Sequence, residues 1–327
     1  RISLQVERLP GGWHKLDYTA CQELSDKILD EMIPEYGNRV FESSHRYRFL
    51  SGRLKRMGRR VLWTLSQELQ KGRFEPAAYE VRFGSGGMLP AIEVKLASGE
   101  TVLVEGRIDR VDILRDQEDS YLRIIDYKTG NRDLSLSDVY YGLNLQLLVY
   151  MKAALASYQS GSSPVKPAGL FFFHIEDPLV YSDERIKEKV EALAARELGL
   201  KGLILEDLKV IRFMDQEFEG SSTFLPVSLN KDQTVSAASS ALDPNSMALL
   251  MKHVDGILTK IGSEITSGKI DIEPVKSGGQ TACQKCRYQS ICQFDTRIPG
   301  NRYRNLRRLT REEVLQRIAR EQEGKQE

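Results

Sequence analysis

Hydrophobic residues follow two patterns along the chain. Short apolar blocks predict β-strands, and apolar residues spaced three and four apart predict helices. Two short apolar blocks, Thr101–Leu114 and Tyr121–Tyr127, flank an acidic turn at Asp116–Ser120. Short apolar blocks bounded by polar turns are typical of β-strands. The pattern therefore predicts a hairpin here, with further strands at Tyr79–Phe83 and Ala168–Ile175.

Longer stretches carry apolar residues at steps of three and four, which is the spacing of one helix face. We expect helices at Asp17–Glu35, at Ser43–Gly72, within Tyr140–Leu155, at Asp183–Leu198 and at Pro244–Gly268. The polar stretch Glu219–Asn245 predicts an exposed loop or hairpin region. We expect three segments: a helical one at 1–75, a core at 76–215 and a C-terminal region at 216–327.

The overall composition is that of a globular chain with no excess of charge. Of the 327 residues, 41% are hydrophobic, and the formal net charge is +1. The basic residues are nevertheless clustered, with seven Lys or Arg and no acid in Arg46–Arg60 and six Arg and no acid in Arg297–Arg311. Such runs are usually solvated surface, and they become candidate phosphate contacts only in a protein that handles nucleic acid.

The sequence lacks the patterns of a membrane span, a signal peptide and a phosphate-binding loop. No segment is long and apolar enough to span a membrane, and the first residues lack the apolar core of a signal peptide. We therefore expect a cytoplasmic protein. The chain does not start with Met, so we expect a fragment or a processed product. It also lacks the Gly-Lys-Ser/Thr of a phosphate-binding loop, so we expect no ATP-driven motor in it.

Three ionisable residues of the expected hairpin indicate metal chemistry. Asp126 and Lys128 are two apart on one strand, so their side chains project from one face, and a hairpin can bring Asp109 beside them. Two carboxylates bind Mg²⁺ through hard oxygen ligands, and an adjacent lysine can orient water or offset developing charge. The alternative is a solvated hairpin with a surface Asp–Lys pair, but the apolar Ile124 and Ile125 argue against it.

The cysteines form a close triplet and one distant residue: Cys283, Cys286 and Cys292, and Cys21. An even number allows two disulfides, but in a cytosolic protein a metal is favoured. Four thiolates can hold Zn²⁺ in a tetrahedral site or an iron–sulfur cluster. The spacing alone does not decide between these two groups.

The hairpin sequences also resemble a known family. Gly-Arg-Ile-Asp-Arg-Val-Asp and Ile-Ile-Asp-Tyr-Lys-Thr-Gly are similar to the nuclease core of the RecB-like branch of the PD-(D/E)XK superfamily. The resemblance implies an α/β fold with a restriction-endonuclease-like core, in which a mixed central sheet is flanked by helices. It makes Asp109 and Asp126 metal ligands and Lys128 the catalytic lysine, and we expect the Tyr127 carbonyl as a third ligand.

The same family has a Gln-x-x-x-Tyr helix after the core, which Gln146 and Tyr150 match. These residues are four apart and share one helix face, although ordinary packing would also explain them. RecB-like nucleases often carry a further His ligand on a helix before the core. His45 lies in that order but lacks the surrounding motif, so a surface position is the alternative.

The cysteine pattern resembles the iron–sulfur staple of RecB-like nucleases, in which one Cys before the core and three after it bind a 4Fe–4S cluster. The resemblance therefore favours a cluster over zinc at Cys21, Cys283, Cys286 and Cys292. Such a cluster would tie together distant parts of the chain and restrict the unfolded state, with a stapled C-terminal region as the result.

Nearly the whole chain resembles the C-terminal nuclease domain of AddB-type subunits of bacterial helicase–nucleases. The resemblance implies a Mg²⁺-dependent deoxyribonuclease, with Mn²⁺ as a substitute, that degrades unwound single strands during double-strand-break processing. It implies DNA and an AddA-type subunit as partners. The alternatives are a stand-alone RecB-like iron–sulfur exonuclease and a non-catalytic, cluster-bearing DNA-binding scaffold. The intact Asp109, Asp126 and Lys128 argue against the scaffold.

Overall fold

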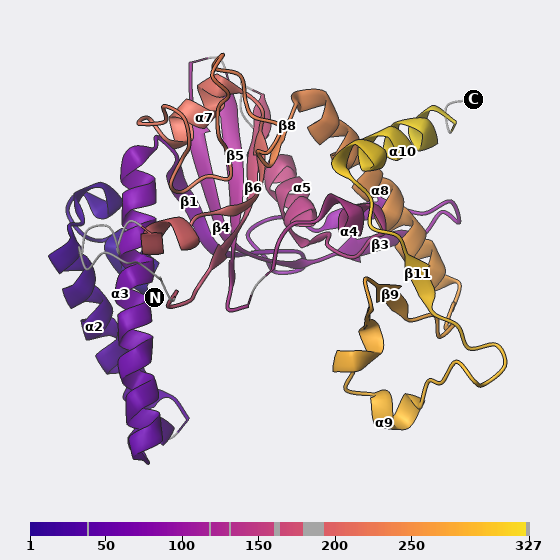
Figure 1. Cartoon of the computed structure of the whole chain (residues 1–327), viewed down its shortest axis with the longest axis horizontal. Helices are drawn as coiled ribbons and strands as arrows, with labels where there is room; N and C mark the ends of the chain where they lie inside the picture. Colours follow the sequence, from indigo (N-terminus) through magenta and orange to yellow (C-terminus); the bar gives the residue numbers. More distant parts are fainter. Residues whose placement is uncertain (38, 118, 131, 160–163, 179–192, 325–327) are drawn as a thin grey trace. The chain divides into compact units, whose positions relative to one another are not determined.

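The computed structural model describes residues 1–37, 39–117, 119–130, 132–159, 164–178 and 193–324 (Figure 1). The described chain forms two compact units. Unit 1 comprises Arg1–Pro90, Glu105–Leu134 and Tyr150–Pro244, and unit 2 comprises Ala91–Val104, Ser135–Val149 and Asn245–Glu327. The helix expected at Asp183–Leu198 falls mainly outside the described residues.

Unit 1 is built on a mixed sheet with the strand order β1-β4-β5-β6-β7-β8. The strands are β1 (Glu75–Phe83), β4 (Gly106–Arg115), β5 (Ser120–Lys128), β6 (Val165–His174), β7 (Lys201–Leu205) and β8 (Ala241–Leu242). Strand β4 runs antiparallel to both of its neighbours, β1 and β5. Strands β5 and β6 run parallel to each other. The hairpin expected from the two apolar blocks is the pair β4–β5, in the interior of this sheet.

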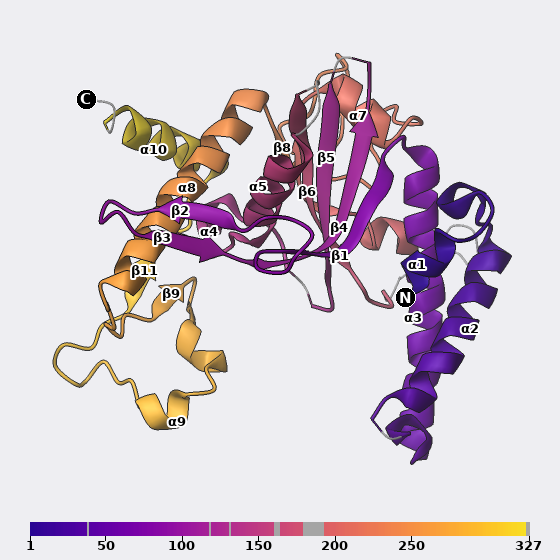
Figure 2. The ribbon, with the colours of Figure 1, turned by 180° about the vertical axis from the view of Figure 1, so that it is seen from behind.

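Helices flank this sheet, as Figures 1 and 2 show. They are α1 (Ile2–Val6), α2 (Tyr18–Glu35), α3 (His45–Lys71), α7 (Leu208–Met214) and the larger part of α5 (Gln146–Tyr158), with short 3₁₀ turns at Gly12–Lys15 and Val40–Glu42. The expected helices before the core are therefore confirmed, and a mixed sheet flanked by helices is the expected architecture.

Caps and close packing explain where α2 and α3 lie. The Asp17 side chain accepts a hydrogen bond from the Ala20 N–H at 2.7 Å, which satisfies a free donor at the start of α2. Gly58 in the middle of α3 does not break the helix. A Cβ at Gly58 would lie 2.7 Å from Ser25 Oγ and 2.8 Å from a Leu29 methyl, so the missing side chain lets the two helices approach.

The core of unit 1 follows the period-two alternation of its strands. Ile125, Phe171 and Phe173 are buried against Leu65 and Leu69 of α3 on one face of the sheet. Residues of opposite parity, such as Ile124 and Phe172, are also buried, so both faces are covered. A sheet covered on both faces explains why β5 and β6 are nearly continuous apolar runs.

The structure corrects the strand expected at Thr101–Leu114, which is broken at Glu105. Its first part is β3 (Thr101–Val104), which pairs with β2 (Ile92–Lys95) in a separate two-stranded sheet of unit 2. The Glu105 carboxylate accepts a hydrogen bond from the Ser85 N–H at 2.6 Å. This contact ties Glu105 to the turn after β1, so the six-stranded sheet takes up the chain only from Gly106.

Unit 2 is mainly helical. It contains α4 (Leu136–Tyr140), the first turn of α5, α8 (Pro244–Thr266), α9 (Gln289–Cys292) and α10 (Arg311–Glu323), with a 3₁₀ turn at Ala282–Lys285. Besides β2 and β3 it has a small sheet of β9 (Val275–Ser277), β10 (Gln280–Thr281) and β11 (Arg304–Leu306). The expected loop Glu219–Asn245 is largely irregular, but its end supplies β8.

Among the residues that the structure describes, no helix is both long enough and apolar enough to cross a membrane.

Candidate active site

The register of the β4–β5 hairpin brings two carboxylates together in unit 1. In the β4–β5 ladder Arg110 lies opposite Ile125 and Val111 opposite Ile124. The same register, continued by one residue, sets Asp109 opposite Asp126. The Tyr127 N–H donates a hydrogen bond of 2.9 Å to Asp109 Oδ2, which fixes that carboxylate against β5.

Asp126 is the most buried group of the site. Its side chain is 2% exposed, and it forms an ion pair with the Lys128 amine, whose side chain is 20% exposed. Burial raises the pKa of Asp126, and the negative charge of Asp109 raises it further, although the hydrogen bond from Lys128 acts in the opposite direction. The charge of Asp109 is therefore close enough to disfavour the ionised form of Asp126.

This arrangement suits a divalent cation. Two carboxylates that approach each other at a half-buried position carry more negative charge than one lysine neutralises, and hard oxygen donors are the ligands that Mg²⁺ and Mn²⁺ prefer. The donor chemistry at Asp109 and Asp126 therefore fits such an ion. Lys128 also lies beside the ring of Phe172, with the amine 5.7 Å from the ring centroid, which holds its stem near the carboxylates.

A third carboxylate stands at the same level of the sheet. Tyr79 pairs with Arg110 and Val81 with Ile108, so Glu80 of β1 falls opposite Asp109. The Glu80 carboxylate is exposed and forms an ion pair of 2.9 Å with Arg107. In the described part of the chain no group of three or more His, Cys, Asp or Glu side chains is gathered as a metal site, so Glu80 does not join the pair.

Gln146 and Tyr150, which match the Gln-x-x-x-Tyr pattern, lie on α5. Gln146 begins this helix and Tyr150 follows one turn later, so the expected common helix face is present. The Tyr150 ring packs edge-on against Phe83 of β1, with centroids 5.9 Å apart. It also lies 3.5 Å from the position of a Cβ at Gly106, where β4 begins. Tyr150 therefore contacts the start of the strand that carries Asp109.

His45 is not brought to the carboxylate pair. It is exposed at the first position of α3, and its ring contacts the Arg48 guanidinium at 3.4 Å. Glu68, near the other end of α3, is the residue that reaches the central strands. At 1.5 Å per residue the helix separates His45 from Glu68 by about 35 Å. The role of His45 as a ligand stays a prediction that this geometry does not support.

The four cysteines differ in their surroundings. Cys21 is fully buried in unit 1, and burial raises the pKa of its thiol to about 11. Cys283, Cys286 and Cys292 lie in unit 2 on the 3₁₀ turn, directly after it and at the end of α9, where they are accessible. Thiols of this kind fit iron or zinc chemically. The described side chains of the triplet are not gathered as a metal site.

The family of the chain follows from a comparison with known protein families. The model of the PD-(D/E)XK nuclease superfamily matches residues 5–293. The chain belongs to this superfamily. In this chain Asp109, Asp126 and Lys128 lie on one face of the mixed sheet.

Curated relatives are also similar over most of the chain. The B-type subunit of the ATP-dependent helicase/deoxyribonuclease from Alkaliphilus oremlandii is 44% identical over 95% of this chain and 27% of its own length. The same protein of Alkaliphilus metalliredigens is 44% identical over 96% and 28%, and that of Clostridium tetani is 39% identical over 98% and 28%. The chain thus spans just over a quarter of the length of these relatives.

On the opposite face of the same two strands, the nuclease sheet buries a network of four charges. Asp112 accepts hydrogen bonds from Arg110 at 2.6 and 2.8 Å and from Arg123 at 2.7 Å. Arg123 also donates to Glu68 of α3 at 2.5 and 3.2 Å. All four side chains are at most 3% exposed. This network joins α3 to β4 and β5 directly behind the carboxylate pair.

The charges of this network balance each other. Burial alone would raise the pKa of Asp112, but Arg110 and Arg123 outweigh it and lower that pKa. Burial acts against the charged form of Arg110 as well, yet Asp112 and Glu68 help to raise its pKa well above the usual range. Trp13 and Phe74 lie over the guanidinium groups of Arg110 and Arg123, at 5.9 and 5.0 Å from the ring centroids. Asp112 and Arg110 therefore stay ionised although they are buried.

This network was not among the features predicted from the sequence. The signal was nonetheless present, because β4 alternates charges on both of its faces: Asp109 on one side, Arg110 and Asp112 on the other. A strand with charge on both faces must pair these charges when it is buried. The partner Glu68 lies 55 residues before Arg123, so only the fold reveals it.

We expect Asp126→Asn to stabilise the metal-free fold increasingly as pH rises. The folded chain holds the Asp126 proton more tightly than the unfolded chain does, because the pKa is raised. The protonated Asp126 side chain stabilises the wild-type fold fully below the ordinary carboxyl pKa, and this stabilisation is lost as pH rises through the raised pKa of the folded state. The uncharged Asn side chain does not lose it. Urea unfolding in EDTA between about pH 4 and pH 8 measures the difference.

The matched control for this series is Asp116→Asn. Lys209 lowers the pKa of Asp116, so this carboxylate stabilises the fold above the ordinary pKa, and its variant should lose stability relative to wild type as pH rises. A difference between Asp126→Asn and wild type that did not change with pH would contradict the raised pKa.

We expect Glu68→Ala to lower the free energy of unfolding by about 3–5 kcal/mol, because it leaves two buried arginines with one carboxylate. The control is Glu217→Ala. Glu217 pairs with Lys71 at 2.9 Å but is 71% exposed, so its loss should cost less than about 1 kcal/mol. Urea unfolding compares the stability of the two variants.

A second variant, Glu68→Leu/Arg123→Met, removes one charge of each sign and should therefore regain most of the stability lost in Glu68→Ala. If this double variant lost as much stability as Glu68→Ala, charge imbalance would not be the cause.

Proposed function

We propose that this chain is the nuclease domain of an AddAB-type helicase–nuclease and hydrolyses phosphodiester bonds of unwound single-stranded DNA as an exonuclease during double-strand-break processing. The observation that carries the proposal is the convergence of Asp109, Asp126 and Lys128 on one face of the sheet of a PD-(D/E)XK nuclease. This residue set matches the chemical needs of the reaction, which are a cation site and an adjacent amine.

In the proposed reaction Asp109 and Asp126 hold Mg²⁺ or Mn²⁺, with the Tyr127 carbonyl as a third oxygen ligand. The bound cation would polarise the scissile phosphate and lower the pKa of a water molecule. The Tyr127 N–H keeps Asp109 aimed at the site. Lys128 would orient the attacking water and offset the negative charge that builds up on the phosphate oxygens. The water gives up a proton as its oxygen bonds to phosphorus, one phosphorus–oxygen bond to the sugar breaks, and the leaving sugar oxygen takes up a proton, so that atoms and charge balance.

DNA binding is proposed to involve Gln146 and Tyr150 and the basic runs. The run Arg46–Arg60 contributes less charge than its composition indicates, because several of its cations are neutralised in the fold. Asp26 pairs with Arg59 at 2.5 Å, and Asp177 pairs with Arg60 at 2.5 Å. We therefore expect binding to weaken with salt, but less steeply than seven free cations would predict.

The partner proposal is drawn from the relatives. Their name makes them one component of an ATP-dependent helicase/deoxyribonuclease. This chain carries no phosphate-binding loop motif and spans just over a quarter of their length. We propose that an AddA-type subunit supplies ATP-driven unwinding and delivers single strands to the site built on Asp109 and Asp126.

The test is cleavage of end-labelled single-stranded DNA by the anaerobically purified chain with Mg²⁺ and with EDTA. We expect cutting only with Mg²⁺, and a fall of at least about 100-fold in Lys128→Ala. Lys166→Ala is the matched control, since it also removes a lysine paired with an aspartate, at 2.7 Å from Asp119, outside the site. Full activity in Lys128→Ala, or cutting in EDTA, would refute the assignment. If wild type failed to cut even with an AddA-type protein added, the scaffold alternative would be favoured.

We further propose that Cys21, Cys283, Cys286 and Cys292 bind a 4Fe–4S cluster with a structural role. The support is the spacing of the triplet and its accessibility on short turns, which allow the thiols to close around a metal group. Cys21 is buried and its thiol pKa is raised, so it would ionise only with a cation beside it. Zinc is the competing occupant.

Metal and sulfide analysis of the anaerobically purified chain tests the cluster. We expect about four iron and four acid-labile sulfide per chain, and a loss of both in Cys286→Ser. About one zinc per chain without sulfide would assign the site to zinc instead. Ser290→Ala, a substitution in the same segment that leaves all thiols in place, is the control and should keep the wild-type content.

A further inference from the structure

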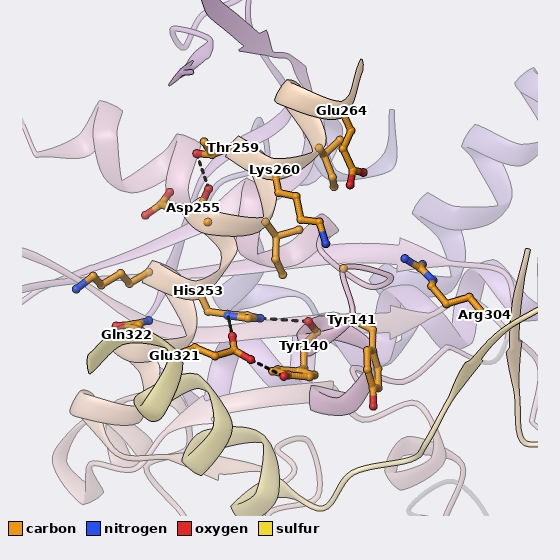
Figure 3. A pocket seen from close by; sticks show the side chains of 15 residues that line it. Tyr140, Tyr141, His253, Asp255, Thr259, Lys260, Glu264, Arg304, Glu321 and Gln322 are labelled. Atoms are coloured by element: carbon orange, nitrogen blue, oxygen red, sulfur yellow. Dashed lines mark hydrogen bonds and ion pairs between the residues drawn. The ribbon is translucent and has the colours of Figure 1, made fainter. Parts of the chain in front are cut away.

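Unit 2 contains a pocket that the proposed nuclease site does not use. Its volume is about 780 Å³, and its walls come from α4, α8, α10 and β11 (Figure 3). All of its lining residues belong to unit 2. This volume lies within the range of pockets that hold small ligands or parts of larger ones.

Two acidic residues of the pocket, Glu264 and Glu321, are held by neighbouring side chains. Glu321 accepts a hydrogen bond of 2.5 Å from the Tyr140 hydroxyl and lies 4.0 Å from His253 Nδ1. The His253 ring stacks on Tyr140 with centroids 5.3 Å apart and planes 3° from parallel. Glu264 pairs with Lys269 at 3.2 Å. These contacts fix the positions of both carboxylates, and Lys269 pairs with the charge of Glu264.

Two cations of the pocket are not compensated in this way. Figure 3 shows the Lys260 amine and the Arg304 guanidinium pointing toward one another across the opening. Both residues are exposed, and neither side chain has an ion pair in the part of the chain that the structure describes. Arg304 differs in this from its neighbours, since Arg297 and Arg302 of the same basic run pair with Asp295 and Glu273.

The orientation of these two groups favours an anion between them. Like charges that face each other repel, and a phosphate group placed between them would turn this repulsion into two charge-assisted contacts. Tyr141 supplies an aromatic wall in the same pocket. Its hydroxyl donates to the Arg307 carbonyl at 3.1 Å, which holds the ring in place. Cations beside a fixed aromatic ring are the usual means of binding a single nucleic-acid strand.

We propose that this pocket binds the backbone and one base of a single DNA strand, with Lys260 and Arg304 contacting phosphate oxygens and Tyr141 stacking on the base. The inference deepens the proposed function, on which it rests for the identity of the strand. It gives unit 2 a strand-binding role of its own, while hydrolysis is assigned to Asp109, Asp126 and Lys128 in unit 1.

The test measures fluorescence anisotropy of a labelled oligothymidylate with the 327-residue chain in EDTA, where cutting is absent, over a range of NaCl concentrations. The double variant Lys260→Ala/Arg304→Ala should bind more weakly, with the slope of log K against log salt reduced by about 1.4, since each phosphate contact contributes about 0.7. The control Lys269→Ala/Arg297→Ala removes the same charge from ion-paired residues of unit 2 and should keep the wild-type slope.

Substitutions of Tyr141 provide an independent test of the pocket. Tyr141→Leu should weaken binding at least about fivefold, whereas Tyr141→Phe, which keeps the ring but loses its hydrogen bond to the Arg307 carbonyl, should weaken it less. Inorganic phosphate at constant ionic strength should weaken binding by wild type more than NaCl does, because it competes for Lys260 and Arg304, and this extra effect should disappear in Lys260→Ala/Arg304→Ala. The same extra effect of phosphate in wild type and in the double variant would overturn the inference.

The outcomes separate this inference from the nuclease proposal. A wild-type slope in Lys260→Ala/Arg304→Ala, or the same reduction in the control, overturns the pocket and leaves cutting by wild type untouched. No measurable binding by wild type at low salt also overturns it. The expected slopes with no Mg²⁺-dependent cutting would sustain the pocket as a strand-binding site and refute the nuclease assignment.

Discussion

The structure depends above all on the buried network of Glu68, Arg110, Asp112 and Arg123. Its two acids and two arginines lie at the contact between α3 and the hairpin β4–β5, with side chains at most 3% exposed. Losing or misplacing one partner would leave an uncompensated buried charge, which is among the costliest changes a core can suffer. A slip of β5 by one residue would turn Arg123 to the wrong face. The network therefore selects the register that sets Asp109 opposite Asp126.

The two faces of the hairpin differ in how far their charges are balanced. Behind it, two acids meet two arginines, and Asp112 and Arg110 stay ionised. In front, Asp109 and Asp126 share one lysine, and the pKa of Asp126 is raised by burial. An imbalance of this kind would be a defect in a purely structural core, but it is what a cation-binding site needs. The balanced face holds the strands in place so that the unbalanced face can attract a metal ion.

The two compact units suggest a division of tasks. Unit 1 contains the mixed sheet and the carboxylate pair, and its basic helix α3 has several cations neutralised by acids of the fold. Unit 2 holds the accessible cysteines, the basic segment with Arg304 and the pocket with Lys260. Pairing lowers the free charge of both basic runs, because Asp26 and Asp177 pair with Arg59 and Arg60 of α3, and Asp295 and Glu273 pair with Arg297 and Arg302 of unit 2. Net composition could not reveal this, because it does not distinguish paired from unpaired charges.

The sequence by itself determined the elements and the chemistry of the hairpin. Period two put Asp126 and Lys128 on one face, and apolar spacing located α2 and α3. These are local properties, set within a few residues by backbone geometry. Tertiary structure alone decided which distant groups meet: Glu68 with Arg123, Glu105 with the turn that ends a strand, and His45 far from the carboxylates. Such pairings depend on how elements pack, and packing is fixed by the whole core rather than by any one segment.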